Sequence, residues 1–350
     1  MLKRLCLWVL SLVIWAVPAI GWANQYRAID LGSLGGSIAV AYGINDRGQV
    51  VGESGSRAFI WDEKSGIRDL GTDSTRLSRA FHINNLGQVV GGCYSYNSQF
   101  QSLSSQDAYV RQPDGEINYL RTLPGETNLT WSVSINDSGM AVGTTYAAPY
   151  APPYYADIIG VRWNTLEDTI EASSLGRGFI PVDVNDNGQV VGHYKDSGGN
   201  WHVLLWEQES GCADTGLSVP AHAINNRGQI IGGEGGWYVW DSATRKILYT
   251  GDGYGNDISD DGHVVGYFGG SDSTDHAFVW DPVGGLVDLG ADARAYGINE
   301  HGSIVGQANV AGEWHAFMWT PVPEPSSVVV VACGFIGISG RLLRGRRKQT

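Results

Sequence analysis

Residues Ile44–Gly52 read INDRGQVVG, and close copies of this nonapeptide recur along the chain. Seven copies end at Gly52, Gly91, Gly143, Gly192, Gly232, Gly266 and Gly306. Successive central glycines, from Gly48 to Gly302, are 34 to 52 residues apart, which is a period typical of repeat architectures. The Asn or Ser of each copy can hydrogen-bond its own backbone, and the central glycine supplies the positive φ of a tight turn. Each copy therefore predicts a β-hairpin.

The sequence around each copy predicts two further strands. One ends in an aromatic residue in six repeats, whereas Arg111 takes that place in the second repeat; the six aromatic residues are Trp61, Trp163, Trp206, Trp240, Trp280 and Trp319. The next strand reads Asp-Leu-Gly, most clearly at Gly71 and Gly290. Four short strands in about 42 residues, with 49 glycines in 350 residues, indicate an all-β chain built from propeller blades.

The two ends of the repeat region complement each other. The segment Tyr26–Gly32, YRAIDLG, is an Asp-Leu-Gly strand without its Trp strand, and no such strand follows Trp319. We therefore predict that residues 24–320 form a seven-bladed β-propeller of four-stranded antiparallel blades, with the last blade closed by the N-terminal strand. The Ile-Asn strand should be innermost, because small residues lie three positions before its Ile or Val. A stacked linear array remains an alternative, since repeats alone do not show closure.

Residues 1–23 have the features of a secretory signal peptide. Lys3 and Arg4 precede the apolar run Leu5–Ile20, and small residues lead to a predicted cleavage after Ala23. An uncleaved membrane anchor is the alternative interpretation. In either case the segment predicts export of the body across a membrane.

Residues 321–350 predict a membrane tail. The apolar run Val328–Gly340 is followed by basic residues up to Lys348, so a transmembrane helix is expected, although the run is shorter than the roughly 20 residues that span a bilayer comfortably. The basic end should remain cytoplasmic. Outside the two ends, the body carries a net charge of about −20, which disfavours nucleic acid as a partner.

Two motifs resemble known families. His276-Ala277-Phe278 and its copy at 315–317 resemble the HAF family of extracellular repeat proteins, over Tyr26–Trp319. The tail resembles the PEP-CTERM sorting signal, whose triplet stands here as Pro323-Glu324-Pro325. The resemblance implies a Gram-negative bacterium in which signal peptidase and an exosortase process the chain, with a transient inner-membrane stage before it reaches the cell surface or the extracellular matrix. It implies no known reaction.

Metal and cofactor motifs are weak. Asp183, Asn185 and Asn187 fit the first half of a calcium loop, but its twelfth position is Tyr194 rather than a bidentate Glu. The plain turn is favoured, and no metal or other cofactor is expected. Three histidines, His202, His276 and His315, occupy one repeated position and are interpreted as structural.

The two longest repeat spacings come from insertions in consecutive repeats, Cys93–Asp107 and Thr144–Asp157. We expect both to project from the same face of the ring, the one that carries the connections between blades. They offer a candidate ligand-binding surface of flat, amphipathic rings: Tyr94, Tyr96, Phe100, Tyr146, Tyr150, Tyr154 and Tyr155. The alternative is a pair of solvated loops. By the same topology Cys93 and Cys212 should lie on opposite faces and form no disulfide.

Two functional hypotheses follow. The first is a non-catalytic propeller that binds or scaffolds extracellular polysaccharide or surface protein; catalytic residues are then absent. The second is a secreted polysaccharide lyase or hydrolase with its site at the mouth of the central channel, where His82, Ser134, Asp183 and Asp257 precede the Ile or Val of their repeats. The first is favoured because the chain has no nucleophile elbow, phosphate-binding loop or zinc-spaced cysteines.

Overall fold

The computed structural model describes residues 26–97, 102–126, 130–146, 158–167 and 172–322. The predicted signal peptide with its cleavage at Ala23, the apolar tail and Pro323-Glu324-Pro325 lie outside the described residues. Within these ranges, the structure contains no helix of the length and hydropathy needed to cross a bilayer. One compact unit spans Ala28–Thr320.

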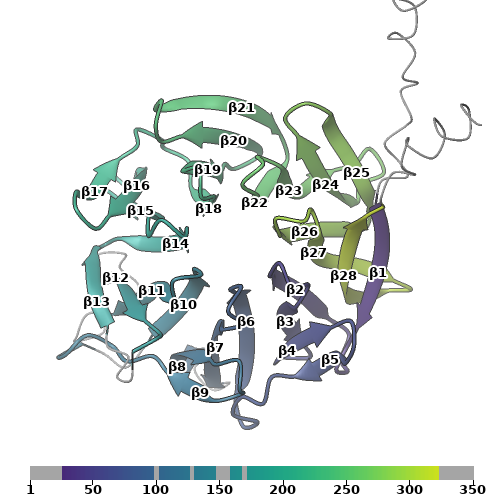
Figure 1. Ribbon diagram of the computed structural model, residues 1–350, viewed down its shortest axis with the longest axis horizontal. Coiled ribbons are helices and arrows are strands. Elements are labelled where there is room, and N and C mark those ends of the chain that lie inside the picture. The colour runs from purple at the N-terminus through teal and green to yellow at the C-terminus, as the bar shows by residue number, and fades with distance from the viewer. Residues whose placement is uncertain (1–25, 98–101, 127–129, 147–157, 168–171, 323–350) are drawn as a thin grey trace, which may run out of the picture. The chain divides into compact units, whose positions relative to one another are not determined.

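The strands form seven four-stranded antiparallel sheets arranged as blades around a central axis (Figure 1). Blade 1 contains β2 (Ala39–Ile44), β3 (Val50–Ser54), β4 (Arg57–Asp62) and β5 (Gly66–Asp69). Blade 2 contains β6 (Leu77–Ile83), β7 (Val89–Asn97), β8 (Ser102–Arg111) and β9 (Ile117–Tyr119). Blade 3 contains β10 (Thr130–Ile135), β11 (Met140–Tyr146), β12 (Ile158–Asn164) and β13 (Ala172–Arg177).

The remaining blades follow the same order. Blade 4 contains β14 (Ile180–Val184), β15 (Val190–Lys195), β16 (Trp201–Glu207) and β17 (Gly211–Asp214). Blade 5 contains β18 (Ala221–Ile224), β19 (Gln229–Gly232), β20 (Gly236–Asp241) and β21 (Lys246–Asp252). Blade 6 contains β22 (Tyr254–Ile258), β23 (Val264–Gly269), β24 (Asp275–Asp281) and β25 (Gly285–Ala291). Blade 7 contains β26 (Ala293–Ile298), β27 (Ile304–Val310), β28 (Glu313–Pro321) and β1 (Tyr26–Gly32).

The pairing of β1 with β28 closes the ring, so the predicted seven-bladed propeller is confirmed and the linear array is wrong. Figure 1 shows β1 against β28, next to blade 1. The side chains of the two strands are also joined, because Asp30 Oδ2 lies 2.8 Å from Nδ1 of His315. The first and last repeats also meet, since the Asn299 side-chain amide donates to the Asn45 carbonyl at 3.0 Å.

The nonapeptides form the predicted hairpins between the two inner strands of each blade. In blade 1, Oδ1 of Asn45 accepts the N–H groups of Arg47 and Gln49 at 3.1 and 3.0 Å, and Gly48 has a φ of 73°. These seven turns lie on one face of the ring, which we call the Asn-turn face. The connections between blades and the insertions leave from the other, which we call the crossover face.

Close packing explains the small residues of the inner strands. Each of these small residues pairs with the last glycine of its own nonapeptide, as Ala41 does with Gly52. A Cβ on Gly52 would lie 1.9 Å from the Val40 carbonyl oxygen and 2.7 Å from the Phe59 ring. The adjoining side chains form apolar clusters in which neighbouring blades are packed against each other. The innermost position predicted for the Ile-Asn strand is therefore confirmed.

Each inner strand carries a β-bulge one residue after its small residue. In blade 1, Ala41 pairs with Gly52 and Gly43 with Val51, which leaves Tyr42 unpaired between them. The same shift occurs in all seven blades. A bulge turns the strand locally and re-aims side chains, so each blade presents an additional residue at its inner edge.

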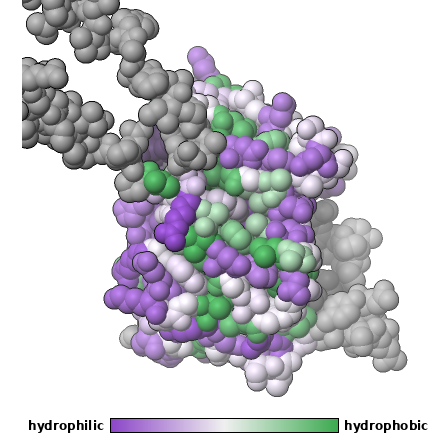
Figure 2. Space-filling model, turned by 90° about the vertical axis from the view of Figure 1, so that its right-hand side faces the viewer, coloured by the Kyte–Doolittle hydropathy of each residue, from purple (hydrophilic) through white to green (hydrophobic). Residues whose placement is uncertain are grey.

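The repeated histidine position has a structural role, because each histidine contacts an aspartate of a neighbouring strand in its blade. His202, His276 and His315 each lie 2.8 to 3.0 Å from the Asp of the outermost strand of their blade. Arg57 makes the equivalent contact in blade 1, to Asp69 at 3.1 Å. Each pair joins the Trp strand to the edge strand. Figure 2 views the rim from the side of β25, β28 and β1, where hydrophobic residues are interspersed with hydrophilic ones.

The two cysteines of the body are both free, as predicted. Cys93 is buried in β7 near the crossover face, and Cys212 is exposed at the start of β17, which begins at the Asn-turn face. Burial raises the pKa of both thiols. A disulfide between them is excluded by their positions on opposite faces.

Candidate functional site

The Asn-turn mouth of the channel is lined by a ring of buried asparagines. Each side-chain amide donates at 2.8 to 3.0 Å to the backbone carbonyl of the equivalent residue in the next blade, as Asn84 does to Asn136. Ser259 interrupts the ring in blade 6, where its Oγ accepts the N–H of His263 at 3.3 Å and makes no bond to blade 7 among the described residues. These bonds satisfy buried polar groups and join every blade to the next except from blade 6 to blade 7.

A second ring, formed by the next residue of each turn, surrounds the first. The backbone N–H of each member donates to the side chain of the following member, and the circle closes from Glu300 to Asp46 at 2.9 Å. The seven members are Asp46, Asn85, Asp137, Asp186, Asn226, Asp260 and Glu300. The carboxylates therefore stabilise the turns, and burial raises the pKa of Glu300.

A cavity of about 140 Å³ lies inside these rings, with His82, Asp183 and Asp257 in its wall. The sequence groups these residues with Ser134, and the structure brings Ser134, His82 and Asp183 together. The Ser134 hydroxyl donates to Asp183 Oδ1 at 2.6 Å and lies 3.4 Å from Nδ1 of His82. The other oxygen of Asp183 accepts the Ile224 N–H at 2.8 Å, so it joins blade 4 to blade 5.

This arrangement differs from a Ser-His-Asp triad. In a triad the serine hydroxyl donates to histidine, and histidine donates to the carboxylate. Here the Ser134 proton is directed to Asp183, so His82 does not activate the hydroxyl for attack. Burial raises the pKa of Asp183, although the adjacent His82 opposes that shift.

Asp257 is the residue of this cavity best suited to proton transfer. Burial, followed by the negative charge of Asp183, raises its pKa to about 7. Its two oxygens accept the N–H groups of Ile258 and Ile298 at 2.8 and 2.9 Å. A carboxyl group with a pKa near neutrality can donate or accept a proton.

The three weak calcium candidates do not converge. Asp183 faces Ser134 in the channel, whereas both ends of the Asn185 side chain bond its own turn and the Asn225 carbonyl. The amide of Asn187 donates to the carbonyl of Asn226 at 2.7 Å. In the part of the chain that the structure describes, no group of three or more His, Cys, Asp or Glu side chains could hold a metal ion.

The crossover mouth of the channel carries aromatic rings that the sequence analysis missed. The distance between ring centroids is 4.9 Å for Trp131 and Phe81. It is 6.0 Å for Phe81 and Tyr42, and 5.9 Å for Tyr42 and Tyr296. These four half-buried residues come from the inner strands of blades 3, 2, 1 and 7, and we call them the aromatic arc. Tyr42, Phe81 and Tyr296 are bulge residues, so the bulges bring rings of neighbouring blades into contact.

Polar groups flank the aromatic arc. The guanidinium of Arg79 pairs with Glu53 and lies over the Tyr94 ring at 5.5 Å. On the other side, Arg294 donates to Asp275 at 2.7 Å and lies 4.9 Å from the Tyr267 ring. Burial and the Glu53 carboxylate raise the pKa of Tyr42 to about 12, so its hydroxyl stays neutral. The mouth therefore combines flat rings with hydrogen-bonding groups.

Only part of the predicted tyrosine surface is described. Tyr94 of β7 lies next to the arc, where Tyr42 and Arg79 are among its electrostatic neighbours. Tyr146 is the last residue of β11 and is half-buried. Tyr96 lies in β7, but its side chain is outside the described residues, as are Phe100, Tyr150, Tyr154 and Tyr155. The hypothesis of a tyrosine-rich surface therefore stays a prediction, to which the structure adds the arc.

The comparisons with known proteins bear on the fold. No family model and no curated protein matches the chain. A chain in the crystal structure of a mitotic checkpoint complex is similar, with 14% identity over 87% of this chain and 96% of that chain and a TM-score of 0.51. The β-propeller domain of the Trilobed protease from Pyrococcus furiosus shares 13% identity over 85% of this chain and 94% of that domain, with a TM-score of 0.50. These similarities show a propeller fold. The Pyrococcus domain is described as having an open velcro topology, whereas β1 closes the last blade here.

Proposed function

We propose that this protein is a non-catalytic propeller that binds or scaffolds extracellular polysaccharide or surface protein through its crossover face. The aromatic arc is the observation that carries the proposal. Aromatic rings provide large, flat contact areas, and the hydroxyl groups of tyrosine add hydrogen bonds. The partly exposed rings of Tyr42, Phe81, Trp131 and Tyr296 are grouped around one channel mouth, where the apolar faces of sugar rings can stack.

The position of the insertions supports the same face. The connections from β7 to β8 and from β11 to β12 both leave their blades on the crossover side, and Tyr94 and Tyr146 stand at their bases. Any ligand held at the mouth could extend toward the two insertions. The ligand surface would then consist of the arc and the predicted tyrosines.

We also propose that the protein is exported. The support is the sequence of both ends: the signal-peptide pattern of residues 1–23, and the Pro323-Glu324-Pro325 triplet with its apolar and basic segments. Export by this route requires signal peptidase and an exosortase, with a transient inner-membrane stage, and delivers the body to the cell surface or matrix. Loss of surface protein in a strain that lacks its exosortase would support this; unchanged surface display would refute it.

A glycan array tests the binding proposal. The purified protein is compared with Trp131→Ala and with a variant in which the insertions Cys93–Asp107 and Thr144–Asp157 are shortened by removal of residues 98–101 and 147–157. The control is Tyr249→Ala, which removes an exposed ring on the outer strand β21. We expect Trp131→Ala to weaken sugar binding about fivefold or more, and Tyr249→Ala to bind as the wild type does. Equal binding by the wild type and Trp131→Ala would refute the arc as the contact surface, provided that both variants are folded.

The alternative is a polysaccharide lyase or hydrolase at the Asn-turn mouth. The raised pKa of Asp257, inside a cavity, is the observation that favours it. If the protein is an enzyme of this kind, it should release reducing ends or unsaturated sugars from matrix polysaccharide, and Asp257→Asn should abolish that release. The absence of released products from the wild type on the array's bound polymers would exclude the alternative.

A further inference from the structure

A second cavity, of about 610 Å³, lies where blade 2 leads into blade 3. It is lined by Asp107 of β8, Tyr119 of β9, the crossover segment 120–126 and Ala172 of β13. Sites for small molecules have volumes of about 300–1,000 Å³, so this cavity has room for a sugar residue. It adjoins the two blades that carry the insertions, and Asp107 is the last residue of the first insertion.

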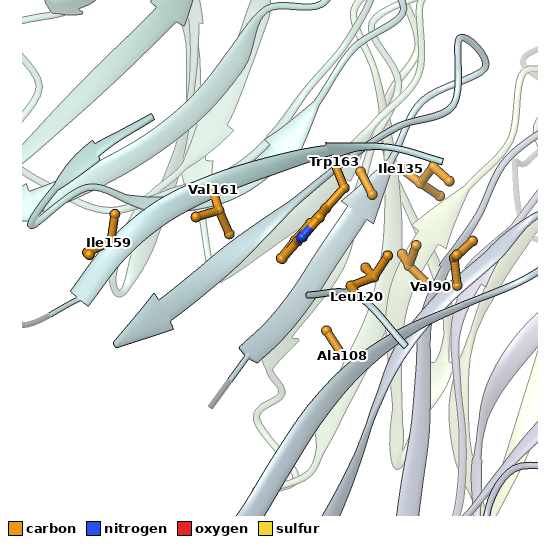
Figure 3. Close-up of a cluster of buried hydrophobic side chains, with 9 residues drawn as sticks. Val90, Ala108, Leu120, Ile135, Ile159, Val161 and Trp163 are labelled. Atoms are coloured by element: carbon orange, nitrogen blue, oxygen red, sulfur yellow. The ribbon is translucent and has the colours of Figure 1, made fainter. Parts of the chain in front are cut away.

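Part of the wall of this cavity is packed against the apolar core of blades 2 and 3. Leu120 belongs to the apolar cluster shown in Figure 3, together with Trp163 and Val161 from β12. The indole N–H of Trp163 donates to the carbonyl of Arg121 at 2.7 Å, which fixes the backbone of the crossover segment. Leu123 and Ala172 pack against the same cluster. The Arg121 side chain therefore extends from a backbone position that the core holds in place.

Among the residues that the structure describes around the cavity, one cation has no ion-pair partner. Asp107 pairs with Arg76 at 2.6 Å, and Glu126 pairs with Arg177 at 3.1 Å. Arg121 is exposed, and its guanidinium forms no ion pair with any other residue that the structure describes. This positive charge is unusual, because the body as a whole carries a net charge of about −20. A guanidinium binds a carboxylate through two parallel N–H donors, so an acidic group is its natural ligand.

Tyr119 supplies an aromatic ring at the edge of the same cavity. Its side chain is 47% exposed, and burial of the remainder raises its pKa, so the hydroxyl is neutral. Asp73 is another acidic group near Tyr119. Its carboxylate is already engaged locally, because it accepts the N–H and the hydroxyl of Thr75 at 2.9 and 2.6 Å. A ring beside a guanidinium that has no ion-pair partner among the described residues matches a sugar with an apolar face and a carboxylate.

We infer that this cavity binds a uronic acid residue of a polysaccharide, with the carboxylate on Arg121 and the sugar face on Tyr119. The inference rests on the proposed function, and it assigns the cavity to acidic sugars and the aromatic arc to the rest of the polymer. An acidic polymer could then contact both sites on the crossover face. The cavity would determine selectivity by charge, whereas the arc would contribute contact area.

Calorimetric titration of the full chain with trigalacturonate and with galactotriose, its neutral counterpart, tests the inference. We expect trigalacturonate to bind more tightly, and Arg121→Gln to weaken that binding by at least about tenfold while leaving galactotriose unchanged. The matched control is Arg227→Gln, which removes an exposed arginine paired with Asp261 on the Asn-turn face and should change neither affinity. Thermal unfolding confirms that both variants are folded.

Three outcomes would overturn the inference. The first is unaltered binding of trigalacturonate by Arg121→Gln, the second is equal wild-type affinity for the two trimers, and the third is an equal loss in the Arg227→Gln control. In each of these cases the proposed function would still be supported if galactotriose binds the wild type and binds Trp131→Ala more weakly. If the wild type binds neither trimer nor any sugar of the array, the inference and polysaccharide binding fail together.

Discussion

The asparagine ring can be tested by exchanging its members between blades. Ser259 shows what a shorter side chain does at this position, so Asn84→Ser copies the blade 6 arrangement into blade 2. Asn84 and Gln88 are both buried, and the Asn84 amide donates at 2.9 Å to Gln88 Oε1 and at 2.9 Å to the Asn136 carbonyl. The substitution removes both bonds and leaves the Gln88 oxygen without this donor.

The expected loss follows from these contacts. Each buried hydrogen bond that is lost costs about 1–2 kcal/mol when a partner stays buried, so Asn84→Ser should lower the free energy of unfolding by about 2–4 kcal/mol. The reverse change, Ser259→Asn, adds an amide directed at the Asn299 carbonyl and should raise it by about 1 kcal/mol. Urea unfolding followed by tryptophan fluorescence measures both. A change of less than about 0.5 kcal/mol for Asn84→Ser would refute a stabilising role of the ring.

Three further predictions concern packing, protonation and thiols. Gly266→Ala should destabilise the fold severely, because the added Cβ would lie 1.8 Å from a backbone oxygen. Gly269→Ala should change the melting temperature little, because no atom lies within 4 Å of its Cβ position. Equal melting temperatures of the two variants would contradict the packing account. Burial raises the pKa of Asp257 from 3.8 to about 7, so the folded state retains a proton that the unfolded state releases. The free energy of unfolding should therefore fall as pH rises from about 4 to about 7, and it should fall less in Asp257→Asn. Identical pH profiles of urea unfolding for the two proteins would refute this. Iodoacetamide should alkylate Cys212 and spare Cys93 in the native protein, as mapped by peptide mass spectrometry; equal labelling would show that Cys93 is accessible.

The repeated elements of the fold could be predicted from the sequence, because each nonapeptide contains its own turn chemistry. Asn45 and Gly48 specify a hairpin locally, and the missing strand after Trp319 predicts closure by Tyr26–Gly32. The asparagine ring was only half predicted. The bonds within a turn are local, whereas the amide of Asn45 reaches a carbonyl 39 residues away, in the next blade.

The aromatic arc could not be predicted from local patterns. Tyr42, Phe81 and Tyr296 share a position within their repeats, but the equivalent residues of the other blades are Val133, Val182, His222 and Asn256, so the repeat shows no aromatic signature. Contact between Tyr42 and Tyr296 also requires the closed ring, because 254 residues separate them. Aligning the bulge positions on a seven-membered circle would have revealed three adjacent aromatic residues.

The acidic-sugar cavity was also beyond the sequence analysis. Arg121 and Tyr119 lie in a connection between blades, where the nonapeptide pattern gives no register. Their significance depends on the pairing of Asp107 with Arg76 and of Glu126 with Arg177, which involves residues up to 51 positions apart. In the sequence alone, the positive charge of Arg121 is balanced by the nearby Glu126, so the segment does not stand out as a binding site.

The most direct test of the account is to locate the bound polymer on the protein by ¹⁹F NMR. The protein is labelled with 5-fluorotryptophan, the resonance of Trp131 is assigned with Trp131→Phe, and the oligosaccharide selected by the glycan array is added. The account predicts that the Trp131 resonance shifts with saturating ligand while that of Trp206, in the outer part of blade 4, stays in place. A shift at Trp206 without one at Trp131 would contradict binding at the aromatic arc.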